Sequence, residues 1–368
     1  MSETKIMLGN EAIARGAFEA GVKVSAAYPG TPSTEISENI VNYPEIYAEW
    51  SPNEKVAMEV AIGASISGVR AMASMKHVGV NVASDPLYTI SYAGVNGGLV
   101  LVAADDPGLY SSQNEQDTRC VARAAMVPVL EPSDSQEAKD FMKYAFDLSE
   151  KYDTPIILRT TTRLSHSQGP VTLEERCEPM DIPYERNVSK FVMMPGNAKG
   201  RHVYVEKRLK DMAEDACTMP INKVEMNDTK IGFITSGIAY QYVKEACPEA
   251  SVLKLGLVHP LPRKLIEEFA SKVETLYIFE ELEPVFEEQI KSWGIKCIGK
   301  EIFTVQGEYS ANMLRKAVLK EEEEIKAAAQ VPARPPILCP GCPHRSVYSV
   351  LNKLNTLDSL LTQPSKDL

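Results

Sequence analysis

The sequence has 368 residues, of which 44% are hydrophobic and 24% charged, which is typical of a globular chain of roughly two or three domains. Its net charge of −11 argues against nucleic-acid binding and against an anionic membrane surface. No apolar run reaches the ~20 residues of a membrane-spanning helix, and residues 1–10 lack the apolar core of a secretory signal. Of seven cysteines only Cys339 and Cys342 lie close together, which indicates reduced thiols and a cytoplasmic location.

The first 180 residues alternate strand-like and helix-like segments, which predicts an α/β domain with a mostly parallel sheet. The predicted strands are 22–27, 71–75, 98–103, 127–130 and 155–160. The predicted helices are 10–20, 54–68, 86–94, 120–125 and 135–151. Asp134 or Ser133 is expected to cap the last helix, with Glu137 as the capping-box partner.

Residues 165–228 mix Pro, Asn, Met and charged residues, and we interpret them as a less regular segment that links two domains. A second alternating unit begins at Lys230. Its predicted elements are strand 231–235, helix 238–247, strand 252–257, helix 265–271 and strand 275–279. A charged helical run at 312–329 and a stiff Pro-containing linker at 333–336 follow.

The segment from Tyr28 to Glu35, with Pro29-Gly30-Thr31 in it, reads as a strand end that turns into a helix. Its hydroxyl groups lie where backbone N–H groups lack partners, and such a helix start favours an anion. Thr31 is thus a candidate helix cap, a substrate contact, or both. Further on, Glu54 enters a helix rich in small residues, where a carboxylate is also favoured by the helix dipole alone.

These two segments resemble the pyrimidine-binding domain of the 2-oxoacid:ferredoxin oxidoreductases, which use thiamine diphosphate. The turn with Gly30, together with residues 103–108 and 111–117, is similar to the alpha subunit of the indolepyruvate branch, and the resemblance runs from about Leu8 to Arg345. It implies that Glu54 protonates the aminopyrimidine ring, that Thr31 lies at the substrate site, and that Tyr28 and Pro29 contact the cofactor.

The resemblance also places Lys76, His77 and Gly79 in a loop over the cofactor, after a predicted strand. Ligands of open parallel sheets bind at the carboxyl ends of strands. Many relatives have Ser or Thr and Gln before the Gly, whereas this chain has Lys-His, and a cation there suits a carboxylate substrate. The alternative is that Lys76 and His77 are surface residues. Arg159 and Arg163 are also expected at the surface, unless they hold a substrate carboxylate or a partner subunit. Asp105 and Asp106 are interpreted as turn formers.

Cys339-Pro340-Gly341-Cys342 has CxxC spacing, which without a second Cys/His pair is a weak metal signal. The resemblance implies that Cys339, Cys342 and His344 open the diphosphate-binding domain. The alternative is a turn with buried thiols. The Gly-Asp-Gly loop that would hold Mg²⁺, and the cysteine run that would hold [4Fe–4S] clusters, do not follow. We therefore expect a truncated end, and weak or no binding of thiamine diphosphate by this chain alone.

The resemblance implies five parts: a pyrimidine-binding domain (1–180), a linker (181–228), a smaller transketolase C-terminal-like α/β domain (229–318), a helix and Pro linker (319–336), and the start of a diphosphate-binding domain (337–368). It implies a subunit that oxidises an aryl 2-oxoacid with coenzyme A and ferredoxin, in an oligomer with a smaller beta-type (gamma-domain) subunit. The alternative is a non-catalytic or incomplete chain that keeps the fold but lacks the metal and cluster sites.

Overall fold

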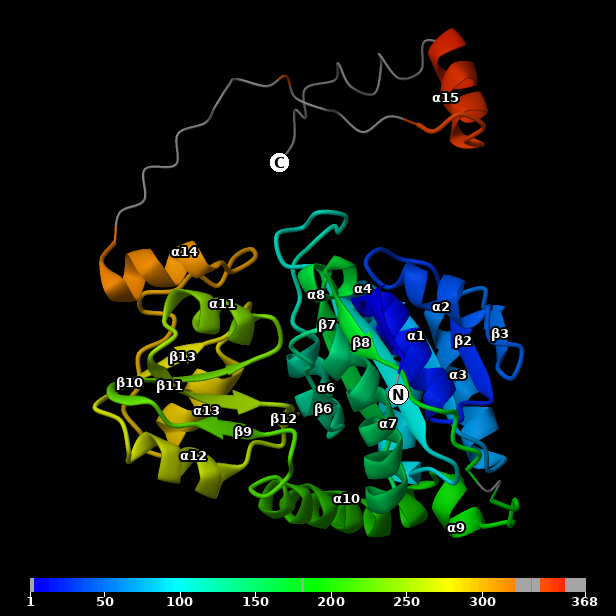
Figure 1. The fold of residues 1–368 in the computed structure, drawn as a ribbon. Coiled ribbons are helices and arrows are strands. Elements are labelled where there is room, and N and C mark those ends of the chain that lie inside the picture. Colours follow the sequence, from blue (N-terminus) through cyan, green and yellow to red (C-terminus); the bar gives the residue numbers. More distant parts are fainter. Residues whose placement is uncertain (1–2, 180–181, 322–331, 333–337, 355–368) are drawn as a thin grey trace, which may run out of the picture. The chain divides into compact units, whose positions relative to one another are not determined.

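The computed structural model describes residues 3–179, 182–321, 332 and 338–354, which fall into one compact unit of residues 1–322 and a second of residues 323–368. The first unit contains three sheets, with orders β12-β6-β7-β5-β4-β2-β3, β13-β10-β11-β9 and β1-β8 (Figure 1). Among the described residues no helix is long and apolar enough to cross a membrane.

Five of the seven strands of the largest sheet coincide with predicted strands, whereas Tyr47–Trp50 and Leu257–His259 were not predicted as part of it. The strands are β2 (Val24–Ala27), β3 (Tyr47–Trp50), β4 (Ala71–Lys76), β5 (Leu99–Asp105), β6 (Val129–Leu130), β7 (Ile156–Thr161) and β12 (Leu257–His259). The helices are α1 (Gly9–Glu19), α2 (Thr34–Ile40), α3 (Glu54–Ile66), α4 (His77–Val82), α5 (Ser84–Ala93), α6 (Thr118–Ala125), α7 (Ser135–Tyr152) and α8 (Thr162–His166). All neighbouring strands are parallel except β12, which runs antiparallel to β6.

Alternation along the central strands divides the core into two layers. Leu99, Leu101 and Ala103 of β5 pack in the layer that holds α3, α5 and α6, whereas Val100 and Val102 pack on the opposite face with α1, α2 and α7. A strand with apolar residues on both faces is the pattern expected of a parallel sheet covered by helices on both sides. This confirms the predicted fold class.

The cap of α7 is as the sequence predicts. Asp134 accepts a hydrogen bond from the backbone N–H of Glu137, and the Glu137 carboxylate accepts one from the N–H of Ser133. A buried Lys254 also pairs with Glu137. Burial by itself would raise the pKa of the Glu137 carboxyl, but the Lys254 charge and the hydrogen bonds to the carboxylate outweigh burial and lower the pKa to about 2.

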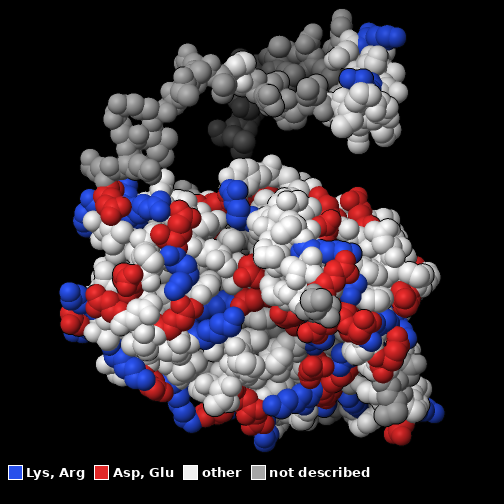
Figure 2. Space-filling view, in the orientation of Figure 1, with Lys and Arg blue, Asp and Glu red and all other residues white. Residues whose placement is uncertain are grey.

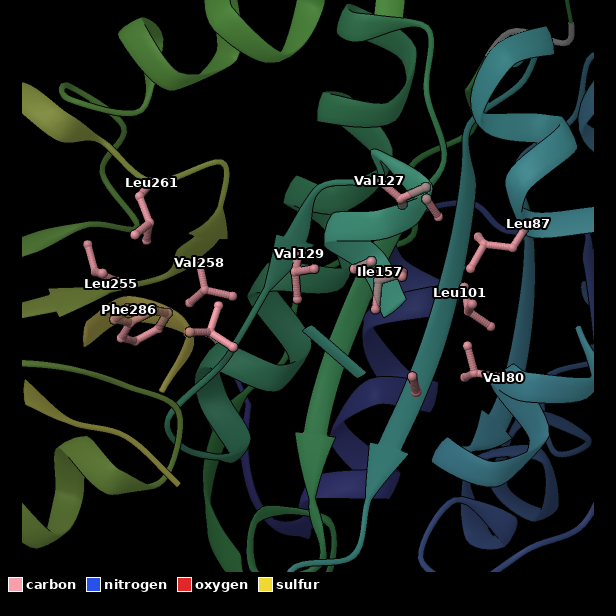
Figure 3. Packing of buried hydrophobic residues seen from close by; sticks show 14 of the residues in the cluster. Val80, Leu87, Leu101, Val127, Val129, Ile157, Leu255, Val258, Leu261 and Phe286 are labelled. Atoms are coloured by element: carbon pink, nitrogen blue, oxygen red, sulfur yellow. The ribbon is translucent and has the colours of Figure 1, made fainter. Parts of the chain in front are cut away.

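The remaining elements of the first unit form the two smaller sheets and their helices. The strands are β1 (Thr4–Leu8), β8 (Gln168–Thr172), β9 (Lys223–Glu225), β10 (Asp228–Ser236), β11 (Ala250–Leu255) and β13 (Thr275–Phe279). The helices are α9 (Val188–Phe191), α10 (Pro195–Asp215), α11 (Ala239–Ala246), α12 (Arg263–Ala270), α13 (Val285–Ser292), α14 (Ala311–Leu314) and the π-helix η1 (Arg315–Leu319). One apolar cluster joins the large sheet to the four-stranded one: it includes Val129 and Ile157 of the former and Leu255 of the latter, all labelled in Figure 3.

Three predictions about this part are wrong. The segment 165–228 contains β8, α9, the 21-residue α10 and β9 rather than irregular chain. Predicted strand 252–257 is two strands in different sheets, β11 and β12, separated at Gly256. The helix predicted at 312–329 ends as η1 at Leu319, and residues 322–331 lie outside the described part. The predicted domain boundaries stay a prediction, because both larger sheets lie in one compact unit.

The second unit contains α15 (His344–Lys353) among its described residues, preceded by the turn at Cys339–Cys342. On the face seen in Figure 2, acidic and basic side chains of the described residues are interspersed.

Candidate functional site

The turn that follows β2 is fixed by hydrogen bonds of its own residues. The Gly30 N–H donates to Thr34 Oγ1 at 2.9 Å, the Ser33 hydroxyl donates to the Gly30 carbonyl at 2.8 Å, and the buried Asn10 amide donates to the Pro32 carbonyl at 2.7 Å. Thr31 is exposed, as is Tyr28. Because α2 begins at Thr34 with Ser33 as its N-cap, Thr31 is not the helix cap that the sequence allowed.

Glu54 is the first residue of α3, and its side chain is half-buried against α4. Asn53 caps the helix by accepting from the Val56 N–H at 3.0 Å. A Cβ on Gly79 would lie 2.6 Å from Cγ and 2.7 Å from Oε1 of Glu54, well inside van der Waals contact. The absence of a side chain at Gly79 is therefore what allows the Glu54 carboxyl to occupy its place.

Lys76 lies at the carboxyl end of β4, and α4 starts at the next residue, so the predicted loop over the site is a strand that runs directly into a helix. The Lys76 ammonium is buried and donates to the Ser111 carbonyl at 2.7 Å and to Ser111 Oγ at 3.2 Å. Asp106 Oδ2 lies 3.8 Å from its Nζ. Burial lowers the pKa of Lys76, and the Asp106 charge opposes part of that effect. Lys76 is therefore not a surface residue.

His77, the first residue of α4, is also buried rather than exposed. Its Nε2 lies 3.2 Å from the Asn114 carbonyl oxygen. A carbonyl only accepts, so Nε2 is the donor in this contact. Nδ1 is buried and has no hydrogen-bond partner among the residues that the structure describes. A buried polar atom without a partner is unusual and is consistent with a place for a polar group of a ligand.

These residues come together at the carboxyl ends of four neighbouring strands. The turn follows β2, Glu54 comes shortly after β3, Lys76 ends β4, and the segment 106–117 follows β5. Besides the contacts of Lys76 with Ser111 and of Glu54 with Gly79, the Ser111 hydroxyl donates to the Thr31 carbonyl at 3.1 Å, and a Cβ on Gly30 would lie 3.3 Å from the Cβ of Lys76. This edge is where parallel α/β sheets bind ligands.

Asp106 and Ser111 are the residues of this arrangement that sequence reasoning did not select. Asp106 was interpreted as a turn former, yet it is buried and accepts hydrogen bonds from the Ser111 N–H, Ser112 Oγ and Thr162 Oγ1. The signal available was the position of its carboxylate after a buried strand and before Pro107. A carboxylate at that point has either to be paired or to be exposed.

The expectation of surface charge is wrong for Arg159. Its guanidinium is buried and pairs with Asp105 and Glu131, each at 2.6 Å. Arg119 lies in the same cluster and binds Asp117 at 2.6 Å and Glu280 at 2.8 Å. Because Glu280 follows β13, the cluster ties the large sheet to the four-stranded one. Arg163, by contrast, is exposed and pairs with Glu308 at 2.7 Å.

The acidic residues of this cluster have divergent pKa values. Burial raises the pKa of both Glu280 and Glu281 to about 7. Burial alone would raise the pKa of Asp117 too, but the Arg119 and Arg159 charges outweigh it and lower the pKa to about 2.

Cys339, Cys342 and His344 lie in the second unit. Cys339 is exposed, Cys342 is partly exposed, and Cys342 Sγ lies 3.4 Å from His344 Nδ1. Within the described ranges, no three His, Cys, Asp or Glu side chains are arranged to hold a metal ion. The role expected of these three residues at the cofactor stays a prediction.

Comparisons with known proteins identify the family of this chain. Residues 15–227 match the family model described as pyruvate flavodoxin/ferredoxin oxidoreductase, thiamine diphosphate-binding. Proteins named indolepyruvate oxidoreductase subunit IorA from Pyrococcus horikoshii and Archaeoglobus fulgidus are 44% and 42% identical, each over 96% of this chain. The chain spans 60% and 61% of their lengths.

Among solved structures, a 2-oxoglutarate:ferredoxin oxidoreductase from Magnetococcus marinus aligns over 87% of this chain and 65% of its own, with a TM-score of 0.71 at 17% identity. A split-gene transketolase aligns over 84% of this chain and 93% of its own, with a TM-score of 0.57 at 18% identity. At these identities the likeness concerns the fold. The family model and the high-identity relatives carry the assignment: this chain belongs to the thiamine diphosphate-binding pyruvate flavodoxin/ferredoxin oxidoreductase family.

Proposed function

We propose that the chain is the subunit of an indolepyruvate-type oxidoreductase that supplies the aminopyrimidine half of a thiamine diphosphate site. The reaction consumes an aryl 2-oxoacid, coenzyme A and two oxidised ferredoxins, and yields an aryl-acetyl-CoA, CO₂, a proton and two reduced ferredoxins. The names of the relatives support the aryl substrate, and the family supports the cofactor. The observation that carries the proposal is the meeting of Glu54 with Gly79 beside the Thr31 turn and Lys76.

The residues at the strand ends fit the cofactor and its substrate. Thiamine diphosphate supplies the nucleophilic carbon that attacks the keto group of a 2-oxoacid. In this proposal Glu54 would exchange a proton with the aminopyrimidine ring nitrogen, and Tyr28, Pro29 and Gly79 would help to hold that ring. A positioned acid or base of this kind contributes about 100- to 10,000-fold to rate.

Lys76, His77 and Thr31 form the proposed substrate contacts. The Lys76 ammonium offsets the charge of the substrate carboxylate, and the Thr31 hydroxyl and the turn donate hydrogen bonds to it. His77 Nδ1, which is buried and has no hydrogen-bond partner among the described residues, is available for a polar group of a ligand. The buried setting of Lys76 and His77 strengthens their interactions relative to water.

The other parts of the proposed enzyme do not belong to the group of residues at the strand ends. Mg²⁺, the diphosphate contacts and [4Fe–4S] clusters are proposed for the complete assembly, together with a smaller beta-type subunit and ferredoxin. Cys339, Cys342 and His344 are proposed to lie near the diphosphate end of the cofactor.

The test is turnover by the assembled enzyme that contains this chain, supplied with thiamine diphosphate, Mg²⁺, coenzyme A and ferredoxin. We expect ferredoxin reduction and aryl-acetyl-CoA formation to be faster with indolepyruvate or phenylpyruvate than with pyruvate or 2-oxoglutarate. Preference for pyruvate or 2-oxoglutarate would overturn the substrate assignment. An assembly that binds thiamine diphosphate but turns over none of the four acids would favour the non-catalytic alternative.

A further inference from the structure

Asp106 is a buried carboxylate at the carboxyl end of β5 that holds several parts of the site at once. One oxygen accepts hydrogen bonds from the Ser111 N–H at 2.9 Å and from Ser112 Oγ, and the other accepts from Thr162 Oγ1 at 2.8 Å. Only 2% of the residue is exposed. These donors fix the carboxylate from the following segment and from the start of α8.

The same carboxylate faces the Lys76 ammonium across 3.8 Å. Within the part of the chain that the structure describes, it is the one carboxylate within 4.0 Å of that Nζ. Ser111 also contacts Nζ, through its carbonyl oxygen and its hydroxyl, and neither group carries a charge. The neighbouring His77 turns its Nε2 toward Asn114.

Asp106 is linked to the site turn as well. Ser111, whose N–H it binds, accepts from Lys76 with its carbonyl and donates with its hydroxyl to the Thr31 carbonyl at 3.1 Å. A single carboxylate thus fixes the loop that contacts both Lys76 and Thr31. We propose that Asp106 is the positioning residue that holds the Lys76 ammonium for the substrate carboxylate, an inference that rests on the proposed function of Lys76.

The two charges influence each other in a direction that can be measured. Burial lowers the pKa of Lys76 and the Asp106 charge raises it. Hydrogen bonds from Ser112, Ser111 and Thr162, with the Lys76 charge, outweigh burial and hold the pKa of Asp106 below its ordinary value. Asp106 is therefore ionised at neutral pH. Removing its charge leaves burial unopposed, so Lys76 would lose its proton at lower pH, by about 1–3 pH units for an opposite charge at this distance.

The experiment measures Lys76 ionisation without any turnover. The full chain is labelled with trace acetic anhydride across a pH series, and mass spectrometry of the Lys76 peptide gives the pH at which the amine becomes reactive. We expect Asp106→Asn to shift that midpoint downward by about 1–3 pH units. Ser112→Ala, which removes a hydrogen bond to Asp106 but no charge, is the matched control and should keep the wild-type midpoint. Asp106→Ser should show the same shift and serves if Asp106→Asn does not fold. An unchanged midpoint in a folded neutral variant would overturn the proposal.

A second readout separates this inference from the proposed function. In the assembled enzyme, the KM for indolepyruvate should rise at a lower pH in Asp106→Asn than in wild type, whereas a loop that is merely loosened would raise KM equally at every pH. Lys76→Met should raise KM at every pH below the value at which the wild-type KM begins to rise. If Lys76→Met leaves KM unchanged, the substrate role of Lys76 fails, while a shifted labelling midpoint would still establish the pairing with Asp106.

Discussion

Replacing Gly79 with alanine should disable the site without weakening the fold. The new Cβ would lie 2.6 Å from Glu54 Cγ, 2.7 Å from Oε1 and 3.0 Å from Cδ, so the Glu54 side chain has to retreat by roughly 1 Å to reach ordinary contact. The obstructing atoms are the end of a flexible side chain, and alanine is better than glycine in a helix by about 0.5–1 kcal/mol. The melting temperature should therefore stay the same or rise.

The expected effect is a lower rate of the reaction. A displacement of about 1 Å at a reacting group can reduce rate about 100-fold. We expect Gly79→Ala to lower turnover of indolepyruvate by at least that factor in the assembled enzyme, with an unchanged circular dichroism spectrum. Gly200→Ala is the matched control, because Gly200 lies in α10 with nothing within 4 Å of the added carbon. Wild-type turnover in Gly79→Ala would refute the contact between Gly79 and Glu54 as an element of the site.

Two further predictions concern the buried ionic cluster. Arg119→Met removes the cation that binds Glu280 at 2.8 Å and leaves Asp117 with Arg159 alone, at 3.6 Å, so unfolding in urea should require about 3–5 kcal/mol less free energy. A loss below about 1 kcal/mol would contradict the pairing. The pKa of Glu281 is about 7 in the folded protein, against an ordinary value of 4.5. Between these two pH values the folded state keeps the proton and the unfolded chain loses it. The contribution of Glu281 to the free energy of unfolding therefore falls as pH rises from about 4.5 to 7. Glu281→Gln should therefore stabilise the protein more at pH 8 than at pH 5, by about 1–3 kcal/mol, and an equal effect at both pH values would contradict the raised pKa.

Local signals in the sequence were sufficient for the five central strands of the large sheet, but not for its edge strands β3 and β12. The buried apolar strands β4, β5 and β7 appear as short runs of apolar residues, and Asp134 with Glu137 marks the start of α7. The helix α10 was missed because polar contacts hold it. Its buried residues include Arg208, which donates to the Asp153 carbonyl at 2.7 Å, and Arg201 donates to the Tyr92 carbonyl at 2.6 Å. Such a helix has little apolar periodicity to detect.

The site could be predicted in part, since a strand end, a turn and a helix start are visible in the sequence around Thr31 and Glu54. Contacts between residues far apart in the sequence could not be predicted. The sequence left open whether Lys76 and His77 lie over the cofactor or at the surface. The structure shows both buried, with contacts to Ser111 and Asn114 of the segment 106–117. Arg159 is the same case, because its partners Asp105 and Glu131 lie 54 and 28 positions away in the sequence.

The central claim is that Glu54 exchanges a proton with the aminopyrimidine ring of bound thiamine diphosphate. The most direct measurement is the rate at which the thiazolium C2 proton of the cofactor exchanges with deuterium in the assembled enzyme, followed by acid quench and NMR, in wild type and Glu54→Gln. Glutamine keeps the size of the side chain but cannot share the proton. We predict exchange about 100- to 10,000-fold slower in Glu54→Gln with the cofactor still bound. An equal exchange rate in the cofactor-loaded variant would contradict the account.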